Sequence, residues 1–245
     1  MDNMMYLAMS GARQVMIKQA TNNHNLANVN TTGFKADIDS FKAMPVYGPG
    51  HPTRVYSEDQ RTGISHTAGS IMNTGMPLDV AVNGDGFIAV QDIDGSEAYT
   101  RNGNLKITEQ GLLVTSIGQP VLGEGGPITI TAFDNIQIGT DGTITIMPIG
   151  QAGGEIAVLD RIKLVNPDLT TVERNERGLF TTDDPVEPAD AEVTLATESL
   201  ESSNVNAVNA LVTMIELSRQ FETQVKLMTT AKDNDVAAAQ LLKMS

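Results

Sequence analysis

Apolar residues recur at helical spacing at both ends of the chain and at strand spacing in the middle. Between Asp2 and Ala27 there is no proline and only one glycine, and small or flexible apolar side chains recur every three or four residues. Thr31-Thr32-Gly33 then provides a helix stop, because glycine readily adopts a positive φ. We therefore predict an N-terminal helical segment within residues 1–33.

Residues 204–245 contain neither glycine nor proline and predict a second long helix. A heptad seam of alternating three- and four-residue steps runs through Leu211, Met214, Ser218, Phe221, Val225, Met228, Lys232, Asp235, Ala239 and Leu242. Its three polar positions weaken a self-contained dimeric coiled coil. The seam instead favours a mixed environment of several helices.

The middle of the chain has short β-branched runs separated by turn sequences such as Asn83-Gly84 and Asn102-Gly103. This spacing predicts an antiparallel β domain over residues 75–190, followed by a linker over residues 191–203. Residues 34–74 are rich in glycine and proline and show no sustained period, which predicts an extended connector. The expected fold class is α+β.

Neither terminal helix is expected to be stable alone, because most helical stability comes from burying an apolar stripe. We therefore predict that the two helices pack on each other and on neighbouring copies, as a coiled-coil-like assembly domain. Five asparagines crowd residues 22–30. They could fix the register of such a bundle or simply cap frayed turns, and the residues leave both interpretations open.

Composition narrows the class of protein. The 245 residues carry a formal net charge of −14 and no cysteine. The acidic balance argues against a nucleic-acid partner and against binding to an anionic membrane. The absence of cysteine excludes disulfides and thiolate metal sites. We also expect no cleaved signal peptide and no membrane-spanning helix, because neither a basic leader nor an apolar run of sufficient length is present.

Candidate catalytic chemistry is sparse. His24, His51 and His66 are scattered, without the spacing of metal ligands. The glycine-rich stretch 123–127 lacks the Gly-Lys-Ser/Thr sequence of a phosphate loop, and a turn explains it better. We predict no catalytic, metal-binding or cofactor-binding residues, no cofactor, and no enzymatic activity.

Four blocks, in order, resemble the bacterial flagellar rod and hook proteins. They are residues 25–35 (NLANVNTTGFK), 77–87 (PLDVAVNGDGF), 99–104 (YTRNGN) and 200–206 (LESSNVN). Four ordered motifs that span almost the whole chain are far more specific than any one of them. Within the family, the short N-terminus, the stretch 123–129 and the ending 240–245 are most similar to proximal-rod members.

The resemblance implies a structural subunit of the flagellar basal-body rod, assembled into a helical drive shaft that transmits torque. It also implies partners among proximal- and distal-rod proteins and copies of the same chain, and export through the flagellar type III apparatus into the periplasmic rod. A distal-rod subunit is one alternative. A β-domain binding module with oligomerising helices is another.

The residues expected at the assembly interface lie in the N-terminal motif and on the C-terminal seam. They are Asn25, Leu26, Asn28, Thr32, Gly33, Phe34, Leu211, Met214, Phe221, Val225 and Met228.

Overall fold

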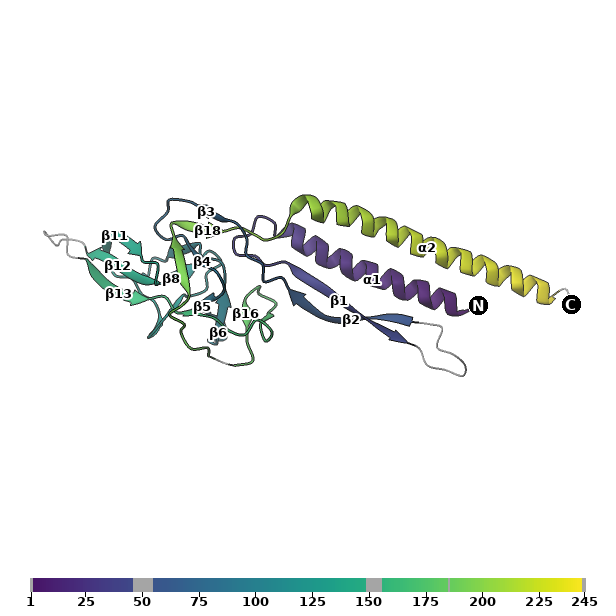
Figure 1. The fold of residues 1–245 in the computed structure, drawn as a ribbon, viewed down its shortest axis with the longest axis horizontal. Coiled ribbons are helices and arrows are strands. Elements are labelled where there is room, and N and C mark those ends of the chain that lie inside the picture. The colour runs from purple at the N-terminus through teal and green to yellow at the C-terminus, as the bar shows by residue number, and fades with distance from the viewer. Residues whose placement is uncertain (1, 46–54, 149–155, 185, 244–245) are drawn as a thin grey trace. The chain divides into compact units, whose positions relative to one another are not determined.

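The computed structural model describes residues 2–45, 55–148, 156–184 and 186–243 (Figure 1). Contacts divide the chain into two units. Unit 1 consists of residues 1–29, 37–65 and 205–245, as far as they are described, and unit 2 consists of residues 30–36 and 66–204. Each unit therefore joins segments that are far apart in the sequence.

Unit 1 contains the two long helices α1 (Asp2–Ala27) and α2 (Ala207–Lys243), which lie side by side (Figure 1). They run antiparallel, because the Asn22 amide near the end of α1 donates to the Ala210 carbonyl near the start of α2, at 2.9 Å. The Asn206 side chain caps α2 by accepting from the Asn209 N–H at 3.1 Å. The prediction of two terminal helices in contact is confirmed.

Unit 1 also contains a β-hairpin, β1 (Asp37–Pro45) with β2 (Val55–Ile64), within the stretch expected to be an extended connector. The hairpin packs on α1, where the Lys18 ammonium lies 4.8 Å from the centre of the Phe41 ring. The half-buried positions that start β1 include Asp37 and Asp39, so no hydrophobic alternation marks the strand in the sequence. Gly48, Pro49, Gly50 and Pro52, which contributed to the connector prediction, lie outside the described residues.

Unit 2 is built from antiparallel strands in several small sheets. One five-stranded sheet has the order β14 (Leu164–Val165), β5 (Phe87–Gln91), β6 (Glu97–Thr100), β16 (Phe180–Thr181), β15 (Glu173–Arg174). A three-stranded sheet has the order β11 (Phe133–Ile138), β12 (Thr143–Pro148), β13 (Ala157–Arg161). Two-stranded sheets pair β17 (Thr194–Thr197) with β4 (Val80–Asn83), β18 (Ser199–Glu201) with β3 (Ile71–Asn73), β7 (Leu105–Ile107) with β8 (Leu113–Thr115), and β9 (Leu122–Gly123) with β10 (Gly126–Pro127).

The core of unit 2 is made of aliphatic side chains from nearly all of these strands. Val80, Ile88, Leu113 and Ile144 are completely buried in it. Together with the two terminal helices, the antiparallel sheets confirm the α+β fold class.

Strands of unit 2 continue through the stretch expected to be a linker. β17 and β18 lie within residues 191–203, and Val193, Leu195 and Leu200 are buried. The acidic, proline-bearing sequence just before them indicated a linker. The two strands themselves have only one or two apolar residues each, so no alternating pattern predicted them. Residues 30–36 and β3 also belong to unit 2, outside the predicted range of 75–190.

Candidate assembly interface

α1 contributes small side chains to the contact between the two helices, and α2 contributes several larger ones. On α2 the buried and half-buried positions recur in alternating steps of three and four residues and form the inner seam: Ala210, Met214, Leu217, Phe221, Gln224, Met228 and Ala231. On α1 the buried residues are Ala8, Ala12 and Val15. A Cβ on Gly11 of α1 would lie 3.1 Å from the Gln224 amide of α2, so the backbone of α1 closely approaches α2 there.

The predicted interface residues of α2 divide between two faces. Met214, Phe221 and Met228 are half-buried on the inner seam. Leu211 and Val225 are instead 48% and 41% exposed. The inner seam therefore differs from the expected heptad at alternate positions, where Ala210 and Gln224 take the places assigned to Leu211 and Val225.

A second apolar face lies at the start of α2 and is not covered by α1. We call it the outer stripe; it consists of Val208, Leu211, Val212 and Ile215, which are 48–69% exposed. The spacing i, i+3, i+4, i+7 places these four side chains on one side of the helix. A contiguous exposed apolar stripe of this kind is more typical of an interaction site than of ordinary solvent-exposed surface.

α1 also exposes large apolar side chains. Tyr6, Leu7, Met9 and Met16 are 43–58% exposed. Both partners of the helix pair therefore present apolar surface to solvent in the isolated chain.

Asn25 and Asn28 of the N-terminal motif have partners within unit 1. The Asn25 amide exchanges two hydrogen bonds with the backbone of Asp37, each 2.9 Å long. Asn28 donates to the His24 carbonyl at 3.0 Å, near the end of α1. Leu26 is half-buried. In this chain Asn25 joins α1 to the first residue of the hairpin, and Asn28 caps the helix end.

The next three predicted residues belong to unit 2. The Thr32 hydroxyl donates to the Asn102 side chain at 2.9 Å, and the Gly33 N–H donates to the Glu201 carbonyl at 2.8 Å. Gly33 has φ of +69°, and a Cβ there would lie 2.3 Å from the Arg101 backbone. Only glycine fits this position without moving the backbone.

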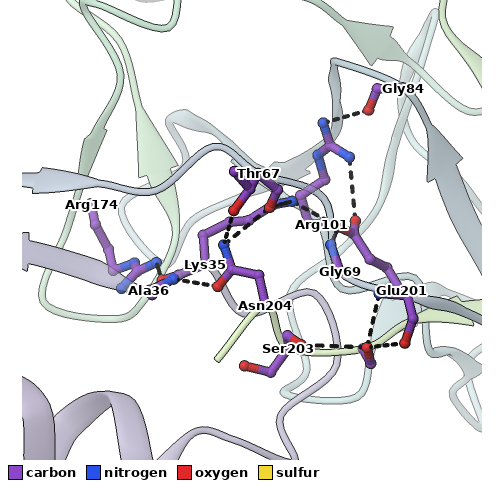
Figure 2. Close-up of polar contacts among 12 residues, drawn as sticks. Lys35, Ala36, Thr67, Gly69, Gly84, Arg101, Arg174, Glu201, Ser203 and Asn204 are labelled. Atoms are coloured by element: carbon purple, nitrogen blue, oxygen red, sulfur yellow. Dashed lines mark hydrogen bonds and ion pairs between the residues drawn. The ribbon is translucent and has the colours of Figure 1, made fainter. Parts of the chain in front are cut away.

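A buried charge cluster connects three of the four sequence motifs (Figure 2). The Lys35 ammonium lies 2.7 Å from Glu201 Oε1, and Arg101 Nη1 lies 3.3 Å from Glu201 Oε2. Their side chains are only 2–3% exposed. The Gly69 N–H also donates to Glu201 Oε1, at 2.8 Å. The Lys35 ammonium donates in addition to the Thr67 carbonyl, at 3.0 Å. We call Lys35, Arg101 and Glu201 the charge cluster.

Burial shapes the electrostatics of the charge cluster. It lowers the pKa of the Lys35 ammonium below the ordinary value of 10.5, while the hydrogen bond to Glu201 opposes the shift. The pKa of nearby His66 is also lowered, first by burial and then by the positive charges of Lys35 and Arg101. These charges are strongly desolvated, so the cluster depends on all three partners being present.

Aromatic and amide contacts hold the same segment beside the charge cluster. The Arg174 guanidinium lies 4.7 Å from the centre of the Phe34 ring and 5.2 Å from that of Phe180. The Asn204 side chain accepts from the Ala36 N–H at 2.8 Å and donates to the Thr67 carbonyl at 3.0 Å (Figure 2). Residues 30–36 and 199–204 are thereby fixed next to each other in unit 2.

Sequence reasoning did not single out the charge cluster. Lys35, Arg101 and Glu201 stand inside recognised motifs, but they are separated by 66 to 166 positions, and no local period links them. The signal that could have found them is that each is the single charged residue of its motif.

Among the described residues, no group of three metal-ligating side chains gathers in one place. No helix in the described ranges is long and apolar enough to span a bilayer.

Two family descriptions match the chain. Residues 81–146 match the D1 domain of the flagellar hook protein FlgE/F/G, and residues 196–241 match the C-terminal region of the flagellar basal-body rod FlgEFG proteins. The first range covers much of the β core of unit 2, and the second covers β18 and most of α2.

Full-length relatives are also similar. The chain is 41% identical to the flagellar basal-body rod protein FlgF of Escherichia coli and 40% identical to that of Salmonella typhimurium, each over 100% of both chains. It is 30% identical to the flagellar basal-body rod protein FlgG of Bacillus subtilis, over 94% of this chain and 95% of that protein.

Proposed function

Because the chain belongs to the family of flagellar basal-body rod proteins, in which it is a structural subunit and not an enzyme, we propose that its terminal helices are the surface through which it assembles into the rod. The observation that carries the proposal is the uncovered apolar surface on both helices. Leu211 and Val225, two of the residues expected at the interface, belong to that surface. Covering it with a neighbour would remove these side chains from water.

The remaining predicted interface residues make contacts within the subunit, and they would affect a neighbour only indirectly. Met214, Phe221 and Met228 set how α2 packs on α1, so they shape the surface that the pair presents. Asn25, Leu26 and Asn28 hold the end of α1 and the hairpin together. Thr32, Gly33 and Phe34 anchor the chain in unit 2.

Membership in the family implies assembly with other rod subunits. Within that setting we place the chain in the proximal rod, next to other rod proteins and copies of itself, as part of a helical shaft that transmits torque. The identity of 41% to the FlgF of Escherichia coli, against 30% to the FlgG of Bacillus subtilis, supports this position. A contact that does not close after one turn generates an open helix, as a shaft requires.

The proposal includes a periplasmic location, reached through the flagellar type III apparatus. A chain without cysteine is compatible with an oxidising compartment, because it has no thiol to form a mispaired disulfide.

The charge cluster has a supporting role in the proposed function. It fixes residues 30–36 beside residues 199–204, so the chain enters and leaves unit 2 at one place. We propose that this brings the end of α1 and the start of α2 together before a neighbour is present.

A substitution on α2 tests the assembly surface. Val225→Asp places a carboxylate on the exposed apolar surface and should strongly reduce the amount of the chain in purified basal bodies. Thr223→Asp adds the same charge two residues away, where the side chain is already exposed and polar, and is the matched control. Circular dichroism on both purified variants checks that they fold alike.

Equal incorporation of Val225→Asp and the parent chain would refute an interface at this part of α2. Loss of incorporation by both variants to the same degree would point to added charge in general, and would also count against the proposal.

A further inference from the structure

The dipeptide Asn-Gly occurs twice in the chain, at residues 83–84 and 102–103. In this dipeptide an asparagine side chain reacts readily with its own backbone, because glycine has no Cβ to shield the attacking nitrogen. In a folded protein the reaction also requires that the side chain and the following peptide are free to move. The two sites share their chemistry, so their surroundings decide which of them reacts.

Asn83 lies at an exposed turn. It is the last residue of β4 and pairs with Thr194 of β17, so the pairing of these two strands ends there. Asn83 and Gly84 are both exposed, and a Cβ on Gly84 would meet no atom within 4 Å. Among the described residues, none forms a hydrogen bond with the Asn83 side chain or with the Gly84 N–H. The reacting atoms are therefore open to water and are not held by neighbours.

The Asn102 side chain is held in place instead. It is 7% exposed. Its Oδ1 accepts from the Thr32 hydroxyl at 2.9 Å and from the Asn104 N–H at 3.1 Å. Its Nδ2 donates to the Ser116 hydroxyl at 2.8 Å. The side chain would have to leave all three partners before it could reach the next backbone nitrogen.

The backbone after Asn102 is packed closely as well. The Gly103 carbonyl accepts from the Val80 N–H at 3.0 Å. A Cβ on Gly103 would lie 1.7 Å from the Val80 carbonyl oxygen, so this peptide has little space in which to rotate. The fold therefore protects Asn102 and leaves Asn83 unprotected.

We propose that Asn83 is a site of spontaneous deamidation in the folded chain. The Gly84 nitrogen loses its proton and forms a bond to Cγ of Asn83. The bond from Cγ to Nδ2 breaks, and the amide nitrogen takes up a proton and leaves as ammonia. Water then opens the resulting cyclic imide. Cleavage of the new bond from Cγ to nitrogen gives aspartate, and cleavage of the original peptide bond gives isoaspartate.

The turn that carries Asn83 is attached to the charge cluster. Arg101 Nη2 donates to the Gly84 carbonyl at 2.9 Å (Figure 2). Arg101 is 3% exposed, and its Nε has no hydrogen-bond partner among the described residues. Loss of the Gly84 carbonyl would leave a second donor of this buried guanidinium without an acceptor, which is costly.

The two products differ in what they do to this hydrogen bond. Aspartate keeps the normal backbone and changes only an exposed side chain. Isoaspartate carries the main chain through Cβ and Cγ, which adds a carbon between Cα of residue 83 and the Gly84 nitrogen. That insertion displaces the Gly84 carbonyl from Arg101. We therefore expect isoaspartate, and not aspartate, to destabilise unit 2.

Ageing of the purified full chain tests the site. The chain is kept at mildly alkaline pH, where the backbone nitrogen is more easily deprotonated, and is then digested with trypsin. Cleavage after Arg101 places the two sites in different peptides, 62–101 and 102–106. Mass spectrometry distinguishes asparagine, aspartate and isoaspartate in each peptide. Asn83 should react at least about tenfold faster than Asn102, because Asn102 must first break its hydrogen bonds. Equal rates, or a faster reaction at Asn102, would overturn the proposal.

The same incubation in urea is the control for the fold. Both asparagines precede glycine, so their rates should become similar once the chain is unfolded. A preference for Asn83 that is just as large in urea would show that the flanking sequence, and not the fold, selects the site. That result would also count against the proposal.

Two variants test the consequence for the charge cluster. Asn83→Gln keeps an amide, but its longer side chain closes the ring much more slowly. After ageing, the parent chain should contain a fraction that unfolds at lower urea concentration, whereas aged Asn83→Gln should unfold as it does when fresh. Fresh Asn83→Asp, which has the normal backbone, should match the fresh parent. Unchanged unfolding of a chain that carries isoaspartate at position 83 would refute the link to Arg101.

Discussion

The β core of unit 2 and the helix pair of unit 1 bury very different side chains. In unit 2, Ile88, Leu113 and Ile144 are completely buried. In the helix pair, the most buried side chains on α1 are small, such as Ala8 and Ala12, while the larger Ile215 of α2 is 56% exposed. Unit 2 thus completes its own core, whereas the helices keep much of their apolar surface uncovered.

This difference shows which part of the chain buries its large apolar side chains without a neighbour. Complete burial of a large aliphatic side chain contributes about 1.5 to 3 kcal/mol. Unit 2 obtains that contribution from its own residues, but the helix pair can obtain it for residues such as Ile215 only from a neighbour. The unfolding free energy of the isolated chain should therefore depend mainly on unit 2. Incorporation into the assembly should depend mainly on the helices.

The largest expected effect is in unit 2, at the charge cluster. Glu201→Ala leaves the Lys35 and Arg101 charges buried without their carboxylate, which should reduce the free energy of unfolding by about 3 to 5 kcal/mol. Denaturant titration of the full chain measures the loss. Glu192→Ala removes an exposed carboxylate from the same unit and should change the unfolding free energy by less than about 0.5 kcal/mol.

Similar unfolding midpoints for Glu201→Ala and Glu192→Ala would mean that the charge cluster contributes little. The difference between the two units would then rest on the aliphatic core alone.

The next effect is a pH dependence of unit 2. Tyr99 is 1% exposed, and burial raises the pKa of its phenol from 10.0 to about 12. A raised pKa means that the folded chain holds this proton more tightly than the unfolded chain. The resulting stability is fully present below pH 10 and is lost as the pH rises through about 12.

The shift corresponds to about 2 to 3 kcal/mol. Tyr99→Phe keeps the ring and removes the phenol, so the difference in stability between the parent chain and Tyr99→Phe should shrink over this pH range. Urea unfolding at a series of alkaline pH values measures it. A constant difference between the two chains would contradict a buried, protonated Tyr99.

The sequence predicted the elements with a strong period and missed those without one. The two helices and the antiparallel sheets followed from apolar spacing and turn residues. The β1–β2 hairpin was missed because Asp37 and Asp39 occupy its inward positions, and its pairing is mainly between backbones. The charge cluster was missed because Lys35 and Glu201 meet only through the tertiary fold.

The heptad assignment on α2 shows how exposed apolar residues complicate a prediction from periodicity. Large apolar residues such as Leu211 and Val225 suggested one seam, but Ala210 is buried and Gln224 is half-buried beside them. Under the proposed function, α2 contacts a neighbour as well as α1, so it would carry two apolar faces. Periodicity alone does not show which face is covered within the subunit.

A smaller effect is expected inside the helix pair. Gly11→Ala improves intrinsic helix propensity by about 1 kcal/mol. The new Cβ would lie 3.1 Å from the flexible Gln224 side chain, which must move slightly and offsets part of the gain. We expect a net stabilisation below about 1 kcal/mol in the melting of the helical circular dichroism signal. Gly11→Ala could instead destabilise the helix pair, and the double variant with Gln224→Ala would then show why. If the double variant is equally destabilised, backbone contacts and not the Gln224 side chain limit how closely the helices approach.

The smallest effect should come from the outer stripe, and it tests the comparison most directly. Ile215→Ala changes a side chain that is 56% exposed and should alter the unfolding free energy of the isolated chain by less than about 0.5 kcal/mol. Leu217→Ala, two residues further along α2, removes a side chain that is 5% exposed and should cost at least about 2 kcal/mol. Hydrogen exchange of the α2 amides in each variant gives local values. Equal losses would show that the isolated chain already buries Ile215, whereas no loss from either would show that the pair forms only when neighbours are present.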